Sequence, residues 1–123
     1  MTDSPQAFDT LQMHAGTAPD AATGARQVPI YQSTAFVFRD ADHAAALFNL
    51  QEVGFIYSRL TNPTVAALAD RLTALEGGAG GICCSSGHAA QIMALFPLMN
   101  PGYNIVASTK LYGGTVQQFS NTI

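Results

Sequence analysis

The sequence predicts an α/β fold in which a parallel sheet is covered by helices. Two short apolar runs, residues 81–85 and 104–108, have the length and composition of buried strands. Segments with helical spacing precede, separate and follow these runs. The order helix, strand, helix, strand, helix is typical of βαβ units. Because two strands do not make a stable parallel sheet, we expect the domain to continue beyond residue 123.

The clearest helix is predicted to begin at Asn62 and Pro63. Asn is a favourable N-cap and Pro is favourable at the first helical position. Apolar residues then recur at spacings of three and four, which predicts one apolar helix face: Val65, Leu68, Leu72 and Leu75. The pair Gly77-Gly78 predicts the end of this helix.

Shorter helices are predicted on both sides of this one. Asp40 or Asp42 is expected to cap a helix over residues 44–50. A further helix follows residues 85–88 and is expected to kink or stop at Pro97. The last helix follows the loop at residues 111–115, and the sequence is expected to end inside it, at Ile123.

Residues 1–39 show no sustained period and are predicted to form an arm that packs on another part of the protein or its assembly. Within the arm, residues 34–38 are expected to be extended. Residues 40–123 are predicted to begin a large α/β domain. Charged residues make up only 11% of the chain, against about 25% in typical proteins, so we expect much of its surface to be covered.

Composition argues against several functions. The net charge is −3 with five basic residues, which disfavours nucleic-acid binding. No apolar stretch is long enough to cross a bilayer, and the N-terminus lacks the pattern of a secretory signal. The histidines show no metal-ligand spacing, so no metal is expected. Cys83 and Cys84 are adjacent and are expected to be buried thiols in a reducing cytoplasm.

An anion site is one interpretation of residues 85–88, Ser-Ser-Gly-His, between a predicted strand and a predicted helix. A helix N-terminus presents unpaired N–H groups, and Gly87 would let an anion approach them closely. Taken alone, the segment favours an ordinary serine cap with a tight turn. For His88, a backbone donor whose side chain packs nearby is a better reading than a catalytic base.

Two further segments carry candidate ligand-binding side chains. Tyr57 and Arg59 lie in a loop, where a guanidinium could bind phosphate oxygens, although an ordinary surface arginine is narrowly the better explanation from these residues alone. Tyr112 follows the second predicted strand, at the edge of the sheet where open α/β folds bind ligands. It could stack on a flat ligand, or it could be an anchoring core residue.

Together these segments resemble a known family. Residues 57–64 (YSRLTNPT), 85–90 (SSGHAA) and 111–115 (LYGGT) resemble three successive motifs of the Cys/Met-metabolism enzymes that depend on pyridoxal 5′-phosphate (PLP). Residues 11–16 and 29–34 also look like that family, so the similarity is collinear over nearly the whole chain. Within the family, residues 51–54 and the histidine after Ser-Ser-Gly most resemble the O-acetylhomoserine sulfhydrylase branch.

The resemblance implies a role for each candidate residue. Gly87 and His88 would give backbone N–H groups to the PLP phosphate. Tyr57 and Arg59 would reach the phosphate of a neighbouring subunit's cofactor. Tyr112 would stack on the pyridine ring and assist proton transfer or departure of the leaving group. The fold implied is the type I aminotransferase-like fold, assembled as dimers and usually tetramers, with the N-terminal arm, residues 1–39, packed on a partner subunit.

The activity implied is γ-replacement, in which acetate leaves O-acetyl-L-homoserine and sulfide adds to give L-homocysteine. Cystathionine γ-synthase, cystathionine γ-lyase and methionine γ-lyase would share every cofactor residue named here. A non-catalytic module that binds phosphate or pairs with a full-length subunit is the alternative of a different class.

The family's cofactor-binding lysine lies well beyond residue 123. Lys110 is the only lysine, and its position does not match that context. We therefore expect the 123 residues to be an incomplete part of the enzyme, inactive alone.

Overall fold

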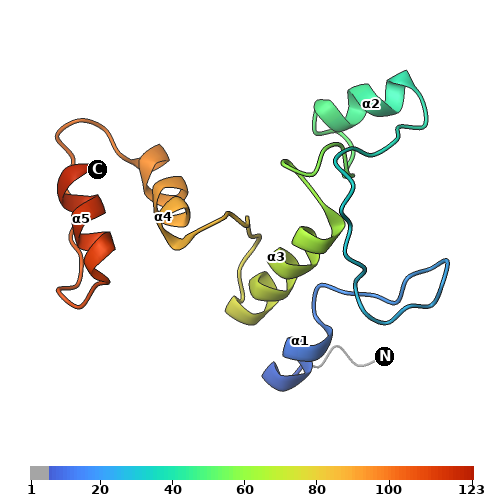
Figure 1. Ribbon diagram of the computed structural model, residues 1–123, viewed down its shortest axis with the longest axis horizontal. Coiled ribbons are helices and arrows are strands. Elements are labelled where there is room, and N and C mark those ends of the chain that lie inside the picture. The colour runs from blue at the N-terminus through green and yellow to red at the C-terminus, as the bar shows by residue number, and fades with distance from the viewer. Residues whose placement is uncertain (1–5) are drawn as a thin grey trace. The chain divides into compact units, whose positions relative to one another are not determined.

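A computed structural model describes residues 6–123. These residues form two compact units, one ending at Ile82 and one spanning Cys83–Ile123. The helices are α1 (Phe8–His14), α2 (Ala41–Phe48), α3 (Pro63–Glu76), α4 (Gly87–Leu95), a 3-10 turn η1 (Phe96–Leu98) and α5 (Gly113–Asn121) (Figure 1). The boundary between these two units lies after Ile82. It does not test the predicted boundary between the arm (residues 1–39) and the α/β domain (residues 40–123), which stays a prediction.

Helix α3 begins and ends as its terminal residues predict. The Asn62 side chain accepts a hydrogen bond from the N–H of Thr64 at 2.9 Å, and Pro63 occupies the first turn. At the other end Gly77 adopts a left-handed conformation with φ of 63°, which closes the helix. The predicted apolar face is present, but Leu68 and Leu72 remain about half exposed at 53% and 50%.

Helix α2 shows which of the two candidate aspartates is the cap. The Asp40 carboxylate accepts from the N–H of His43 at 2.7 Å, so the helix begins at Ala41, three residues earlier than predicted. Next to it, Arg39 donates to both carboxylate oxygens of Glu52 at 3.1 Å. This exposed pair joins the start of α2 to the loop that follows it.

Helix α1 was not predicted. It has seven residues and no side-chain cap at its N-terminus, so its sequence carries no start signal. It packs against α3. Arg71 on α3 donates to the carbonyl oxygen of Ala15 at 2.9 Å, and Gly16 then turns the chain away with φ of 69°.

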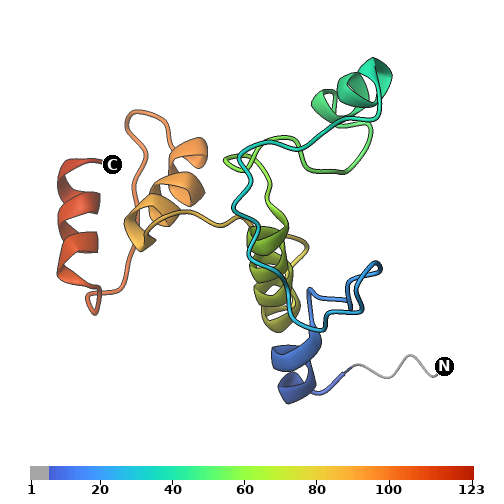
Figure 2. The same ribbon diagram turned by 45° about the vertical axis from the view of Figure 1, so that its right-hand side comes forward.

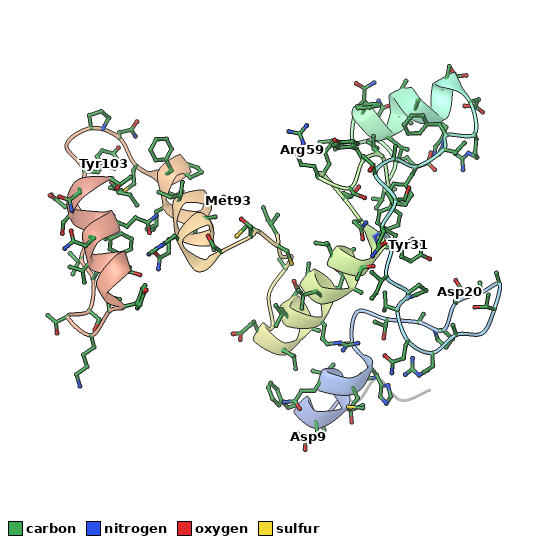
Figure 3. The ribbon with its side chains drawn as sticks, in the orientation of Figure 1. Asp9, Asp20, Tyr31, Arg59, Met93 and Tyr103 are labelled. Carbon is green, nitrogen blue, oxygen red and sulfur yellow. The ribbon has the colours of Figure 1, made fainter. Side chains whose placement is uncertain are left out.

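Residues 29–35 of the predicted arm bond to the segment that leads into α3. Asn62 is buried and joins them, because its amide nitrogen donates to the carbonyl oxygen of Tyr31 and to the Ser58 hydroxyl, each at 2.9 Å. Figure 3 shows Tyr31 beside the start of α3, where its N–H donates to the Thr64 hydroxyl at 2.9 Å. Ala35 pairs with Tyr57 through an isolated antiparallel bridge. This part of the arm therefore packs on its own chain, and its contact with a partner subunit stays a prediction.

In the second unit, α4 and α5 lie side by side in both ribbon views (Figures 1 and 2). Ser86 caps α4 by accepting from the N–H of Ala89 at 3.1 Å. The prediction of a serine cap within residues 85–88 is therefore confirmed. The α-helix stops before Pro97 and tightens into η1, which confirms the predicted break. Helix α5 ends at Asn121, and the N–H of Thr122 still bonds to the carbonyl oxygen of Gln118, so the prediction that the sequence ends inside a helix stays a prediction.

The two predicted strands do not pair within the described residues. Residues 81–85 and 104–108 belong to no ladder, and Ile82 and Val106 are 82% and 100% exposed. A parallel strand takes its hydrogen bonds from neighbouring strands, and neither segment has one here. Within residues 6–123, the prediction that these two segments are buried strands was therefore wrong.

Few apolar side chains of the described residues are buried. Leu47 is the only buried apolar residue among them. Between residues 6 and 123, no helix combines the length and the apolar character that crossing a bilayer requires. A chain with 48% hydrophobic residues and so little core leaves extensive apolar surface available for further packing.

Candidate functional site

The N-terminus of α4 presents two free backbone donors. Ser86 occupies the N-cap, and the N–H groups of Gly87 and His88 donate to no atom of the described residues. A Cβ added to Gly87 would meet nothing within 4 Å. Open space therefore lies above Gly87, beside two unpaired N–H groups at the positive end of a helix, which is an arrangement suited to an anion.

An aromatic side chain lies next to these donors. The ring of Tyr112 packs against the ring of His88 with centroids 6.0 Å apart and planes tilted by 39°. Tyr112 is the N-cap of α5, and its carbonyl oxygen accepts from the N–H groups of Thr115 at 2.9 Å and Val116 at 3.2 Å. Its backbone is therefore fixed, while the residue as a whole is 77% exposed, which leaves its ring available to a ligand. The expected packing of the His88 side chain against a neighbour is confirmed.

Polar contacts between α4 and α5 hold these groups together. Gln91 donates to the hydroxyl of Thr115 at 3.0 Å, and Thr115 is buried. Gln118 donates to the carbonyl oxygen of His88 at 3.1 Å. Sequence reasoning missed these residues. The available signal was the spacing, since Thr115 and Gln118 recur three apart on α5 and His88 and Gln91 three apart on α4.

The second candidate group lies in the loop between α2 and α3. The guanidinium carbon of Arg59 is 5.6 Å from the centre of the Tyr57 ring, so the cation stacks on the aromatic face. Figure 3 shows Arg59 on this loop. Arg59 forms no ion pair with any described residue, unlike Arg39, which Glu52 neutralises. Its charge is therefore available to an anion.

The structure brings some of the predicted residues together. Gly87, His88 and Tyr112 form one group in the second unit, and Tyr57 and Arg59 form another in the first. In residues 6–123 no three His, Cys, Asp or Glu side chains gather closely enough to hold a metal ion. Cys84 is exposed, so its predicted burial was wrong, and Cys83 is of intermediate exposure.

Comparison with known proteins identifies the chain. The family model for Cys/Met metabolism PLP-dependent enzymes matches residues 9–123. The O-acetyl-L-homoserine sulfhydrylase 1 of Thermus thermophilus is 54% identical over 94% of this chain, which corresponds to 28% of the relative. The chain thus spans somewhat more than a quarter of that protein's length.

Solved structures show the same fold for this part. A structure assigned as an O-acetylhomoserine (thiol)-lyase from Campylobacter jejuni, which carries a pyridoxyl-lysine monophosphate, matches with a TM-score of 0.86 and 49% identity. The match covers 94% of this chain and 28% of that one. The cystathionine γ-lyase of Lactobacillus plantarum matches with a TM-score of 0.75 and 34% identity, over 92% of this chain and 27% of its own. The chain is therefore part of a type I PLP fold and belongs to the family of Cys/Met metabolism PLP-dependent enzymes.

Proposed function

We propose that this chain is part of a transferase that replaces the acetate of O-acetyl-L-homoserine by sulfide, giving L-homocysteine. The Cγ–O bond of the substrate breaks and a Cγ–S bond forms, so the products are homocysteine and acetate. The site supports this reading through one arrangement, the unpaired N–H groups of α4 beside the exposed ring of Tyr112. The 54% identity to a sulfhydrylase, against 34% to a cystathionine γ-lyase, favours replacement by sulfide over cleavage of cystathionine.

The residues of the second unit fit a phosphorylated pyridine. The free N–H groups of Gly87 and His88 would hold the phosphate, in the open space that a side chain at Gly87 would narrow. Tyr112 would pack on the ring. Bound PLP supplies an electron sink for the substrate carbanion. The chain's own part is to orient that ring and to hold a proton at the Tyr112 hydroxyl near the departing acetate.

Arg59 and Tyr57 would complete the phosphate site of a neighbouring subunit. An unpaired guanidinium stacked on an exposed aromatic ring is poised to bind a doubly charged anion through two parallel hydrogen bonds. This role requires an oligomer, and we propose a tetramer built as a dimer of dimers. We place the enzyme in the cytoplasm, where the exposed thiol of Cys84 would stay reduced.

Intact mass spectrometry of the complete gene product tests the cofactor. The protein is incubated with PLP and reduced with borohydride, which fixes the cofactor permanently to its lysine. We expect one adduct per subunit, on a lysine outside residues 1–123, together with release of acetate from O-acetylhomoserine when sulfide is added. An adduct on Lys110 would contradict the assignment. A protein of 12.9 kDa without an adduct would exclude catalysis by this chain alone and favour a binding or assembly role.

The choice of sulfur nucleophile is tested on the same material. Purified enzyme is given O-acetylhomoserine with either sulfide or cysteine, and the thiol and thioether products are separated. Homocysteine with a higher kcat/KM for sulfide supports the proposal. A preference for cysteine would instead place the protein with the cystathionine γ-synthases.

Replacing Arg59 by alanine is expected to weaken PLP binding by about 10- to 100-fold, because a hydrogen bond to a charged group contributes about 1.5–3 kcal/mol. Absorbance titration of the complete apoenzyme measures the dissociation constant. Arg39→Ala is the matched control, since Arg39 is exposed in the same unit and already paired with Glu52. Equal loss in both variants would contradict a specific role for Arg59.

Subunit mixing tests whether Arg59 acts across an interface. Arg59→Ala and Tyr112→Phe proteins are dissociated, mixed and reassembled. If Arg59 serves a neighbour's cofactor, each mixed pair contains one intact site, and activity rises well above that of either variant alone. If Arg59 serves its own subunit, no intact site forms and mixing restores nothing.

A further inference from the structure

Gly114 lies in the first turn of α5, directly against the two aromatic rings of the site. A Cβ added there would lie 2.7 Å from Cε1 of His88 and 2.7 Å from Cε1 of Tyr112, with Nε2 of His88 at 2.9 Å. Favourable contacts between carbon atoms occur at about 3.5–4.0 Å. The rings therefore occupy the space that any larger residue at this position would need.

The neighbouring residue, Gly113, is not crowded by the two rings in this way. A Cβ added to Gly113 would meet nothing within 4 Å. Neither Gly113 nor Gly114 has a positive φ, so the backbone conformation does not require glycine at either position. Glycine is less favourable than alanine within a helix. The rings of His88 and Tyr112 explain the glycine at position 114, because they fill the space that a Cβ would need.

The two helices cannot separate freely to relieve a clash. The hydrogen bonds from Gln91 to Thr115 and from Gln118 to the carbonyl of His88 hold α4 and α5 together. The carbonyl of Tyr112 is bonded to the first turn of α5. An added methyl group at residue 114 would therefore be accommodated by turning the ring of His88 or Tyr112.

We propose that Gly114 is a positioning residue: its bare backbone sets the orientation of the Tyr112 ring against His88, and thereby the plane on which the cofactor ring stacks. This inference rests on the proposed function, because it assigns the geometry of the stacking residue named there. Gly114 itself would touch neither substrate nor cofactor.

The test compares Gly114→Ala with Gly113→Ala in the complete PLP-loaded enzyme. We expect Gly114→Ala to keep its cofactor, to change the visible circular dichroism band of PLP, and to lower kcat about tenfold or more, because misplacing a group by about 1 Å can cost roughly 10²-fold. Gly113→Ala should match the wild type in spectrum and kcat. Wild-type spectrum and kcat in Gly114→Ala, or equal defects in both variants, would overturn the proposal.

A second variant separates ring positioning from misfolding. In the double variant Tyr112→Ala, Gly114→Ala, the ring whose orientation the methyl group would change is gone, and the His88 ring can turn into the space that it leaves. We expect its kcat and spectrum to equal those of Tyr112→Ala alone, even if Gly114→Ala by itself fails to fold. A further loss beyond Tyr112→Ala would overturn the proposal. If the wild-type enzyme neither binds PLP nor performs γ-replacement, the proposed function fails, which is a separate and recognisable result.

Discussion

Tyr112→Phe is expected to lower kcat for homocysteine formation by about 10² or more while leaving the cofactor bound. General acid–base catalysis by one positioned group contributes roughly 10²- to 10⁴-fold, and this substitution removes only the hydroxyl. The ring would still pack against His88, and the backbone of residue 112 would still begin α5. Steady-state kinetics with O-acetylhomoserine and sulfide, together with PLP content per subunit, measure both parts of the expectation.

Two further variants separate the role of the Tyr112 hydroxyl from that of its ring. Tyr112→Ala also removes the ring, so it should lose PLP affinity by about tenfold, since an aromatic pair contributes about 0.5–1.5 kcal/mol. Tyr103→Phe is the control, because Tyr103 is an exposed tyrosine of the same unit outside the site. Full kcat in Tyr112→Phe would show that the hydroxyl moves no proton and would leave Tyr112 with a stacking role only.

Local signals in the sequence predicted the helix ends well. Asp40, Asn62 and Ser86 each cap a helix by accepting from an N–H two or three residues along the chain. Gly77 supplies the left-handed turn that closes α3. These features are determined within one helical turn, so a short stretch of sequence contains all the information needed to recognise them.

Features that depend on distant residues were not predictable in the same way. The Asn62 amide bonds to Tyr31, 31 positions earlier, and nothing in either local pattern indicates the pairing. Residues 104–108 have the composition of a buried strand, yet a strand needs neighbours that local sequence does not name. Gly114 looks like any glycine in a loop until the rings of His88 and Tyr112 are placed around it.

The candidate site shows the same difference between features set by local sequence and features set by tertiary contacts. The chemistry of Gly87, Tyr112 and Arg59 could be read from residue type and motif, because a helix start, an exposed aromatic ring and a loop arginine are local descriptions. The hydrogen bonds of Gln91 and Gln118, which hold α4 and α5 together, required the structure. Residue type thus predicted the groups that contact a ligand, and tertiary contacts determine how those groups are held.

Gly16→Ala is expected to cost about 3 kcal/mol or more of the free energy of unfolding. An added Cβ would lie 2.7 Å from both the carbonyl oxygen of Ala67 and the backbone nitrogen of Arg71. These are backbone atoms of α3 and cannot rotate away, unlike side-chain atoms. Left-handed backbone adds about 1–2 kcal/mol for a residue with a Cβ, and overpacking typically adds about 1–3 kcal/mol. Urea unfolding of the complete gene product measures the change.

Gly24→Ala separates the two contributions to that cost. Gly24 has φ of 70°, nearly the same as the 69° of Gly16, but a Cβ added there would meet nothing within 4 Å. It should therefore show the backbone penalty alone, about 1–2 kcal/mol. A larger loss in Gly16→Ala than in Gly24→Ala measures how tightly α1 and the following turn are held on α3. Equal losses would mean that residue 16 can move away from α3 without loss of stability. Only the backbone conformation would then require glycine at this position.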